Sequence, residues 1–309
     1  MASLERENSL IFAQEREGKS KKEIVSFFTT GQTRWNSTFY LLQRFLRLAQ
    51  FLPKALLILR DKGKAPPLPS QADQKRLESL CQLLEMFETA TLALEGDHLT
   101  LPLVPSILAD LKGKLQSAAE EKDLVTRSQC AQLFLQAFEK RFASIFSENN
   151  LALQAAALHP TFGHLPWISD SLHDDVWMSL KKLGNQLRSS DESKIQISVK
   201  PFLRAIRKEF EAKPSRHVDD PLLWWKSHND LSSLYPLVQY LWGIPASSSS
   251  AERLFSSLGH IVSHAPQRSP STVKQLALLR EYQKQPSYDF QQLLKAVNEQ
   301  KDEILSGEK

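Results

Sequence analysis

The chain has 309 residues, of which 41% are hydrophobic and 24% are charged, and its formal net charge is +4. This composition is typical of a soluble globular protein and excludes a fibrous or largely disordered chain. The sequence offers no apolar run of about eighteen residues, and the N-terminus MASLERENSL resembles no secretory signal, so we expect neither secretion nor a membrane span.

The first 32 residues predict a partly disordered segment, with poor order up to about residue 20 and one strand at IVSFFTT, residues 24–30. This end of the chain has an excess of positive charge: the first 65 residues carry twelve Lys and Arg against six Asp and Glu. A solvated basic face explains this excess, and contact with nucleic-acid phosphates is the alternative interpretation.

Apolar spacing predicts helices through the next part of the chain. The first begins near Phe39, carries Arg44 and Arg47 on its polar side and runs to Pro53, and a proline-rich linker follows at residues 62–71. Three longer helices are then expected over Leu77–Leu94, through Leu111 and Leu115, and along the phenylalanine stripe from Phe134 to Phe146. At helical spacing this stripe predicts a core rather than a cofactor site.

The helical spacing of apolar residues is lost between residues 186 and 219, so we interpret this stretch as a linker. The block after it is rich in aromatic residues, which are enriched both in protein cores and at the centres of interfaces. Both interpretations stay open for these side chains. The residues we predict for interaction are Trp224, Trp225, Tyr235, Pro236, Tyr240, Trp242, Leu254 and Phe255.

Three ordered stretches carry a family resemblance: TRWNSTFYLLQRFL from Thr33, ALHPTFGHLPWI from Ala157, and a long run from Asp220 to Gly259 that ends in SSSSAERLFSSLG. Together they resemble the downstream part of hAT-superfamily transposases, most closely the domesticated, BED-finger-associated relatives. The third stretch is similar to the C-terminal dimerisation region of that family. The resemblance covers about 230 residues of the chain.

The resemblance implies an RNase H-like core interrupted by an all-helical insertion, with two aspartates and one glutamate holding divalent metal ions. Glu252 matches the glutamate, but the 32 residues before Thr33 contain no aspartate. One carboxylate cannot hold two metal ions. We therefore expect no catalytic residue, metal or cofactor, with Glu252 vestigial. A second departure is Leu158-His159-Pro160, where the family usually has Leu-Asp-Pro.

Glu252 also has a purely structural explanation. Ser249 and Glu252 have the spacing of a capping box, in which each side chain accepts a hydrogen bond from the backbone N–H of the other. Apolar residues then follow at helical spacing, so we predict that Glu252 lies in the first turn of an amphipathic helix. Capping is favoured over metal ligation.

The sequence thus predicts a mainly α protein, with a helical insertion, the C-terminal helices of a truncated RNase H-like core, and little or no complete sheet. The expected parts are an N-terminal segment (1–32), a helical insertion domain (33–185), a linker (186–219), a dimerisation region (220–285) and a C-terminal helix and tail (286–309).

We expect a catalytically inactive interaction protein that pairs with itself or with a related hAT-derived protein. The alternative is a DNA-associated transcriptional regulator that binds through a basic N-terminal face, where Arg34, Arg44 and Arg47 are the candidate contacts. Neither a membrane nor a small-molecule substrate is expected as a partner. The family resemblance implies a nuclear location, and the cytoplasm is the alternative.

Overall fold

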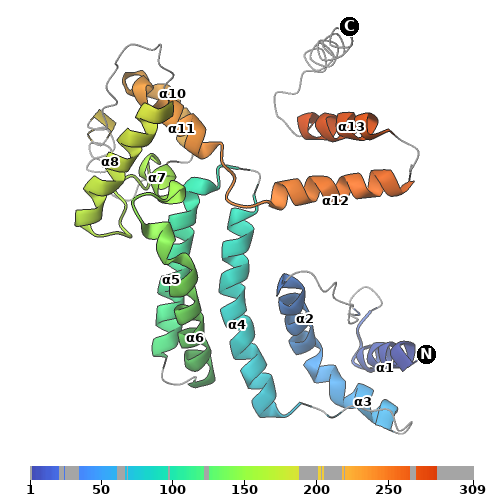
Figure 1. Ribbon diagram of the computed structural model, residues 1–309. Helices are drawn as coiled ribbons and strands as arrows, with labels where there is room; N and C mark the ends of the chain where they lie inside the picture. Colours follow the sequence, from blue (N-terminus) through green and yellow to red (C-terminus); the bar gives the residue numbers. More distant parts are fainter. Residues whose placement is uncertain are drawn as a thin grey trace. The chain divides into compact units, whose positions relative to one another are not determined.

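The computed structural model describes residues 2–20, 24, 35–60, 67, 69–96, 98–121, 125–187, 201–202, 204, 218, 220–264 and 269–283 (Figure 1). All regular elements in these ranges are helices, and none of the residues described forms a strand, which confirms the mainly α prediction. The strand predicted at residues 24–30 lies outside the described residues except for Ile24. The same holds for the C-terminal tail after residue 283.

Contacts divide the chain into two compact units, residues 1–247 and 248–309. The division falls after Ser247 rather than near residue 219, because the aromatic block packs into the first unit. The α-helices of the first unit are α1 (Ala2–Arg16), α2 (Trp35–Leu48), α3 (Leu52–Arg60), α4 (Gln71–Leu94), α5 (Val104–Glu120), α6 (Val125–Phe142), α7 (Leu151–Ala157), α8 (Asp170–Leu187), α10 (Pro221–Ser227) and α11 (Tyr235–Trp242). Short 3₁₀ helices lie at Ala49–Phe51, Leu101–Leu103, Ala143–Phe146 and Asn229–Leu234.

The N-terminal segment is a correction to the sequence analysis. Residues up to about 20 were predicted to be poorly ordered, but α1 covers most of them and packs against α3. Leu10 and Ala13 of α1 are buried together with Leu48, Phe51 and Ala55. The apolar residues of α1 follow the helical repeat only weakly, so the sequence does not reveal this helix. Burial against α3 stabilises it instead.

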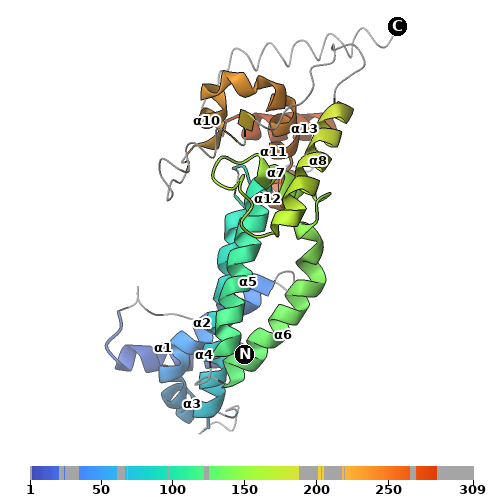
Figure 2. The ribbon, with the colours of Figure 1, turned by 90° about the vertical axis from the view of Figure 1, so that its left-hand side faces the viewer.

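The helices α4, α5 and α6 pack together as a long antiparallel group (Figures 1 and 2). α4 begins at a complete capping box, in which the Ser70 hydroxyl accepts from the Asp73 N–H at 3.1 Å and the Asp73 carboxylate accepts from the Ser70 N–H at 3.2 Å. The core of the group contains Leu83, Leu115 and Phe138. The phenylalanine stripe therefore lies largely in the core, as predicted.

A second core joins α7, α8, α10 and α11. It includes Phe202 and Val218, two described positions of the stretch that the sequence predicted to be a linker. Phe202 stacks on Trp225 with ring centroids 5.2 Å apart and planes 4° from parallel. Part of that stretch is therefore anchored in the core.

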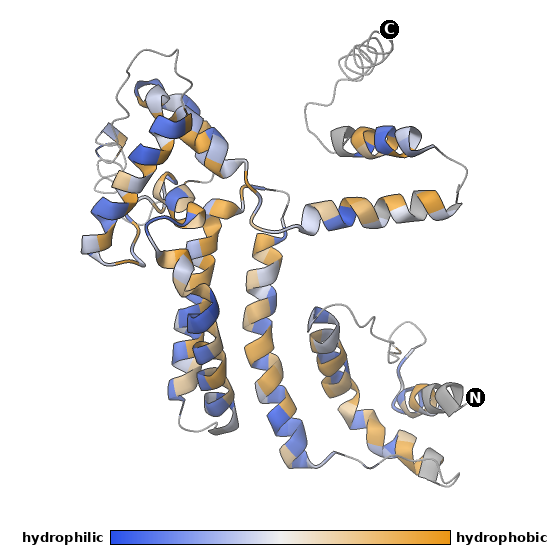
Figure 3. Cartoon of the chain, in the orientation of Figure 1, coloured by the Kyte–Doolittle hydropathy of each residue, from blue (hydrophilic) through white to orange (hydrophobic). Residues whose placement is uncertain are grey.

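The second unit contains α12 (Ser249–His264) and α13 (Pro270–Gln283), which contact each other. Every apolar side chain described in this unit is at least partly exposed. Figure 3 shows apolar residues repeating along α12.

None of the described helices combines the length and the apolar character that crossing a membrane requires.

Candidate functional site

The tryptophans of the aromatic block lie inside the first unit. Trp224, Trp225 and Trp242 are each no more than 5% exposed. The indole Nε1–H of Trp225 donates to the carbonyl oxygen of Leu158 at 3.2 Å, and that of Trp242 donates to Ala155 at 3.1 Å. These carbonyls lie at the C-terminal end of α7, where the regular helical hydrogen bonds end, and the carbonyl of Ala155 also accepts from the Leu158 N–H at 3.3 Å. The three tryptophans therefore serve the core of their own chain.

The other predicted residues of the block differ in exposure. Tyr235 is half-buried, and its hydroxyl donates to the carbonyl oxygens of Trp225 at 3.0 Å and His228 at 3.3 Å. Pro236 is exposed in the first turn of α11, and Tyr240 is 43% exposed. Of the residues of this block that were predicted for interaction, only Pro236 and Tyr240 are exposed.

His159 is a residue whose role the sequence did not predict. Its ring is 4% exposed, stacks on Phe162 at a centroid distance of 4.5 Å and contacts Trp242 at 5.6 Å. The backbone N–H of Thr161 donates to Nδ1 of His159 at 3.2 Å. A carboxylate could accept the same hydrogen bond, so the histidine keeps the turn that the family's aspartate would make while its ring fills the core. The histidine at this position, where the family usually has the aspartate of Leu-Asp-Pro, was the sequence signal that could have indicated this role.

The apolar residues of α12 are the exposed part of the predicted set. Phe255 is 70% exposed and Leu254 is half-buried. Val262, which lies two turns beyond Phe255 on the same side of the helix, is 42% exposed. A single exposed apolar side chain is normal on a protein surface, whereas several on one side of a helix are typical of an interaction surface.

Glu252 lies in the first turn of α12, as predicted, but the cap lies one residue earlier. The first helical hydrogen bond runs from the N–H of Glu252 to the carbonyl oxygen of Ser248 at 2.9 Å, so Ser248 occupies the cap position that was predicted for Ser249. The Ser248 hydroxyl donates to Oε1 of Glu252 at 3.0 Å. The carboxylate also lies at the positive end of the helix dipole, which stabilises it.

The divalent metal site of the family can be tested on these residues. Glu252 is exposed and bonded to Ser248. Within the described ranges, no three His, Cys, Asp or Glu side chains lie close enough together to hold a metal ion. The residues around Glu252 therefore do not fit a two-metal centre.

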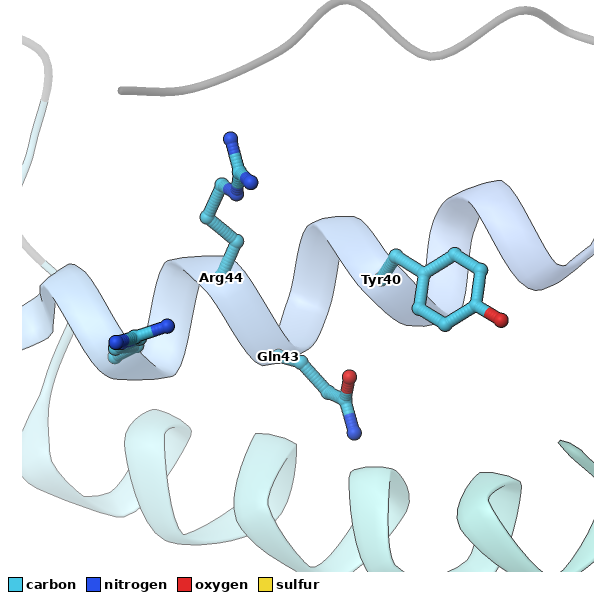
Figure 4. A pocket seen from close by; sticks show the side chains of 4 residues that line it. Tyr40, Gln43 and Arg44 are labelled. Carbon is cyan, nitrogen blue, oxygen red and sulfur yellow. The ribbon is translucent and has the colours of Figure 1, made fainter. Parts of the chain in front are cut away.

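The basic side of α2 forms a pocket of about 420 Å³ lined by Tyr40, Gln43, Arg44 and Arg47 (Figure 4). The Tyr40 hydroxyl donates to the carboxylate of Glu88 on α4. Burial raises the pKa of Glu88, and the charge of Glu95 adds to this effect. Two of the candidate nucleic-acid contacts thus share one pocket, while Arg34 lies outside the described residues.

Trp35 is the first residue of α2, four residues before the predicted start near Phe39, and its side chain is 40% exposed. It lines a second, apolar pocket of about 310 Å³ together with residues of α4 and α6. This tryptophan therefore belongs to the surface of the first unit.

Residues 207–282 match the family model of the hAT family C-terminal dimerisation region. This part of the chain is therefore similar to an hAT dimerisation region. This region includes α10, α11, α12 and nearly all of α13, and it supports descent from an hAT-superfamily transposase, as the resemblance implied. No curated protein sequence matches the chain.

The hAT dimerisation region therefore has two structurally different parts. Its first part, through Trp242, contributes to the core of the first unit. In its second part, from Ser249, every apolar side chain described is at least partly exposed, whereas the first part combines its buried tryptophans with the exposed side chains of Leu222, Leu223 and Tyr240. Sequence similarity alone does not distinguish these two parts, because both are rich in apolar residues.

Proposed function

We propose that this protein is a catalytically inactive, hAT transposase-derived interaction protein that self-associates, or pairs with a related hAT-derived protein, through α12. The observation that carries the proposal is the 70% exposed side chain of Phe255 within the hAT dimerisation region. Burying one such aromatic side chain contributes about 1.5–3 kcal/mol to association. Aromatic residues of this kind are the usual hot spots of interfaces.

The test is the oligomeric state of the full chain at micromolar concentration, measured by mass photometry and sedimentation. Phe255→Glu places a charge at the centre of the proposed surface and is expected to give a monomer. Ser250→Glu is the matched control, because it adds the same charge to the opposite side of α12 at an exposed position. A wild-type chain that stays monomeric, alone and with a related protein, contradicts the proposal.

Catalytic inactivity is part of the same proposal. It is supported by the hydrogen bond between Ser248 and Glu252, which gives that carboxylate a structural role at the start of α12. The expected result is no magnesium-dependent nicking of duplex DNA by the full chain. Nicking that disappears in Glu252→Ala would overturn this part of the proposal while leaving self-association in place.

A second candidate function is DNA association, which the pocket on α2 favours. Arg44 and Arg47 lie one turn apart and line the same pocket, and Gln43 adds an amide that can bind a phosphate oxygen. Such contacts neutralise phosphates without reading bases, so binding should tolerate any sequence and weaken with salt. A gel shift with duplex DNA at low salt tests this function, and no shift at micromolar protein would exclude it.

We further propose a nuclear location for this protein, on the basis of its hAT descent, with the cytoplasm as the alternative. Fluorescence microscopy of the tagged full chain tests it.

A further inference from the structure

An apolar pocket on the surface of the first unit is a candidate binding site for a helix. Trp35 of α2, Leu84 and Phe87 of α4, and five residues of α6 line it, and its volume is about 310 Å³. The five residues of α6 are Phe134, Ala137, Phe138, Arg141 and Phe142. The first four of them lie at positions i, i+3, i+4 and i+7, which is the arrangement of four residues that forms the hole of knobs-into-holes packing.

Ala137 is the small, exposed residue of this hole, whereas Phe134 is half-buried and Phe138 is buried. Its small side chain leaves room on the outer surface of α6. Phe87 packs edge-on against Phe134 at a centroid distance of 5.3 Å and supports the wall. The hole is therefore suited to one large apolar side chain, with a positive charge at the end marked by Arg141.

We infer that α12 of a second copy of this chain packs into this pocket, antiparallel to α6, with Phe255 as the knob. This inference rests on the proposed self-association and names the surface that receives α12. In this register Glu252, Phe255 and Gly259 are spaced by three and four residues, and Arg141, Phe138 and Phe134 have the same spacing in the reverse direction.

Each of the three opposed pairs is complementary. Glu252 meets Arg141, and its carboxylate can accept this contact beside the hydrogen bond from Ser248, since a carboxylate has about four acceptor positions. Phe255 enters the hole above Ala137. Gly259 faces Phe134, and a Cβ at Gly259 would meet no atom within 4 Å in the chain, so this position is open to a bulky partner.

Two copies related by a twofold axis would exchange α12 reciprocally, which closes the assembly and doubles the buried area. The 70% exposed side chain of Phe255 would be buried in both copies. The exposed side chain of Trp35 would be covered in the same contact.

The test compares the dimer dissociation constant of full-length variants by mass photometry and sedimentation. Ala137→Glu blocks the hole and is expected to weaken the dimer about tenfold or more. Gln136→Glu adds the same charge at an exposed neighbour that does not line the pocket, and should leave the dissociation constant unchanged.

Gly259→Leu is the sharper variant, because leucine favours the helix by about 1 kcal/mol over glycine and has open space in the chain. It should keep or raise the helix content by circular dichroism and still weaken the dimer about tenfold.

Mixing Ala137→Glu with Phe255→Glu gives a further readout. One intact pocket and one intact α12 remain in the mixed pair, so partial dimerisation should return. Dimers that are lost in Phe255→Glu but unaffected by Ala137→Glu and Gly259→Leu would overturn this inference and leave self-association standing. A wild-type monomer, including one whose α12 occupies its own pocket, would overturn both.

Discussion

The indole nitrogen of Trp225 donates a hydrogen bond to the carbonyl oxygen of Leu158, 67 residues earlier in the chain and 3.2 Å away. This bond ties the first part of the hAT dimerisation region to the end of α7. Since the donor and the acceptor are both buried, neither can exchange its partner for water. Trp225 is thereby fixed as a core residue, and the proposed association surface lies on α12 instead.

Trp225→Phe is expected to destabilise the first unit by about 1–3 kcal/mol, because the buried carbonyl of Leu158 loses its donor. The midpoint of urea denaturation followed by fluorescence measures the loss. Tyr240→Phe removes a polar atom from a 43% exposed side chain and should change stability by no more than about 0.5 kcal/mol. Equal effects of the two variants would contradict the core role of Trp225.

The start of α4 should show an acid-dependent loss of stability. Hydrogen bonds from the Ser70 side chain and backbone lower the pKa of Asp73. A lowered pKa in the folded state contributes stability that is present above the unfolded value and lost as pH falls through the folded value. Ser70→Ala should therefore lose more stability at neutral pH than in acid. Denaturation midpoints of both proteins between about pH 2 and 7 test this, with Ser117→Ala as an exposed control.

Glu88 should have the opposite dependence. Burial raises its pKa, so the folded state favours the protonated carboxyl, and the contribution of this group to stability is lost as pH rises through the folded value. Glu88→Gln keeps an oxygen for the Tyr40 hydroxyl and removes the buried charge. We expect the variant to be more stable than the wild type at neutral pH, with the difference shrinking in acid. A variant that is less stable at neutral pH would contradict this account.

The proposed contact between Glu252 and Arg141 can be tested by exchanging the two charges. Arg141→Glu and Glu252→Arg each place like charges together and should weaken the dimer by about fivefold, whereas the double variant should recover most of the loss. The dimer dissociation constant at low salt measures the effect. Lys140→Glu, at an exposed position outside the pocket, controls for the change in net charge. Without recovery in the double variant, the antiparallel register would have to be abandoned.

DNA association, if it uses the pocket on α2, should lose about one unit of the slope of log affinity against log salt for each arginine removed. Arg44→Ala and Arg47→Ala should each show this change for any duplex sequence. Arg76→Ala is a control, because Arg76 is exposed on α4 and pairs with Asp73 instead. Unchanged slopes in both pocket variants would remove the pocket from consideration.

The helices and the family could be predicted from the sequence. Spacing of apolar residues predicted that α4, α5 and α6 exist, because a helix repeats its buried face every three to four residues whatever it packs against, but it missed the start of α6 at Val125, nine residues before Phe134. Motifs placed the dimerisation region, which the family match confirms. The first turn of α12 followed from local chemistry, with an error of one residue at its cap.

Only the tertiary structure decided which apolar side chains are internal. Trp225 and Phe255 look equally suited to an interface in the sequence, but Trp225 is 4% exposed and Phe255 is 70% exposed. Burial depends on what lies opposite a side chain, and for Trp225 those residues are Leu158 and Phe202, far away along the chain. The order of α1 has the same origin, since its partner α3 begins some fifty residues after it. Local periodicity sets which face of a helix is apolar, and only the folded chain determines what covers that face.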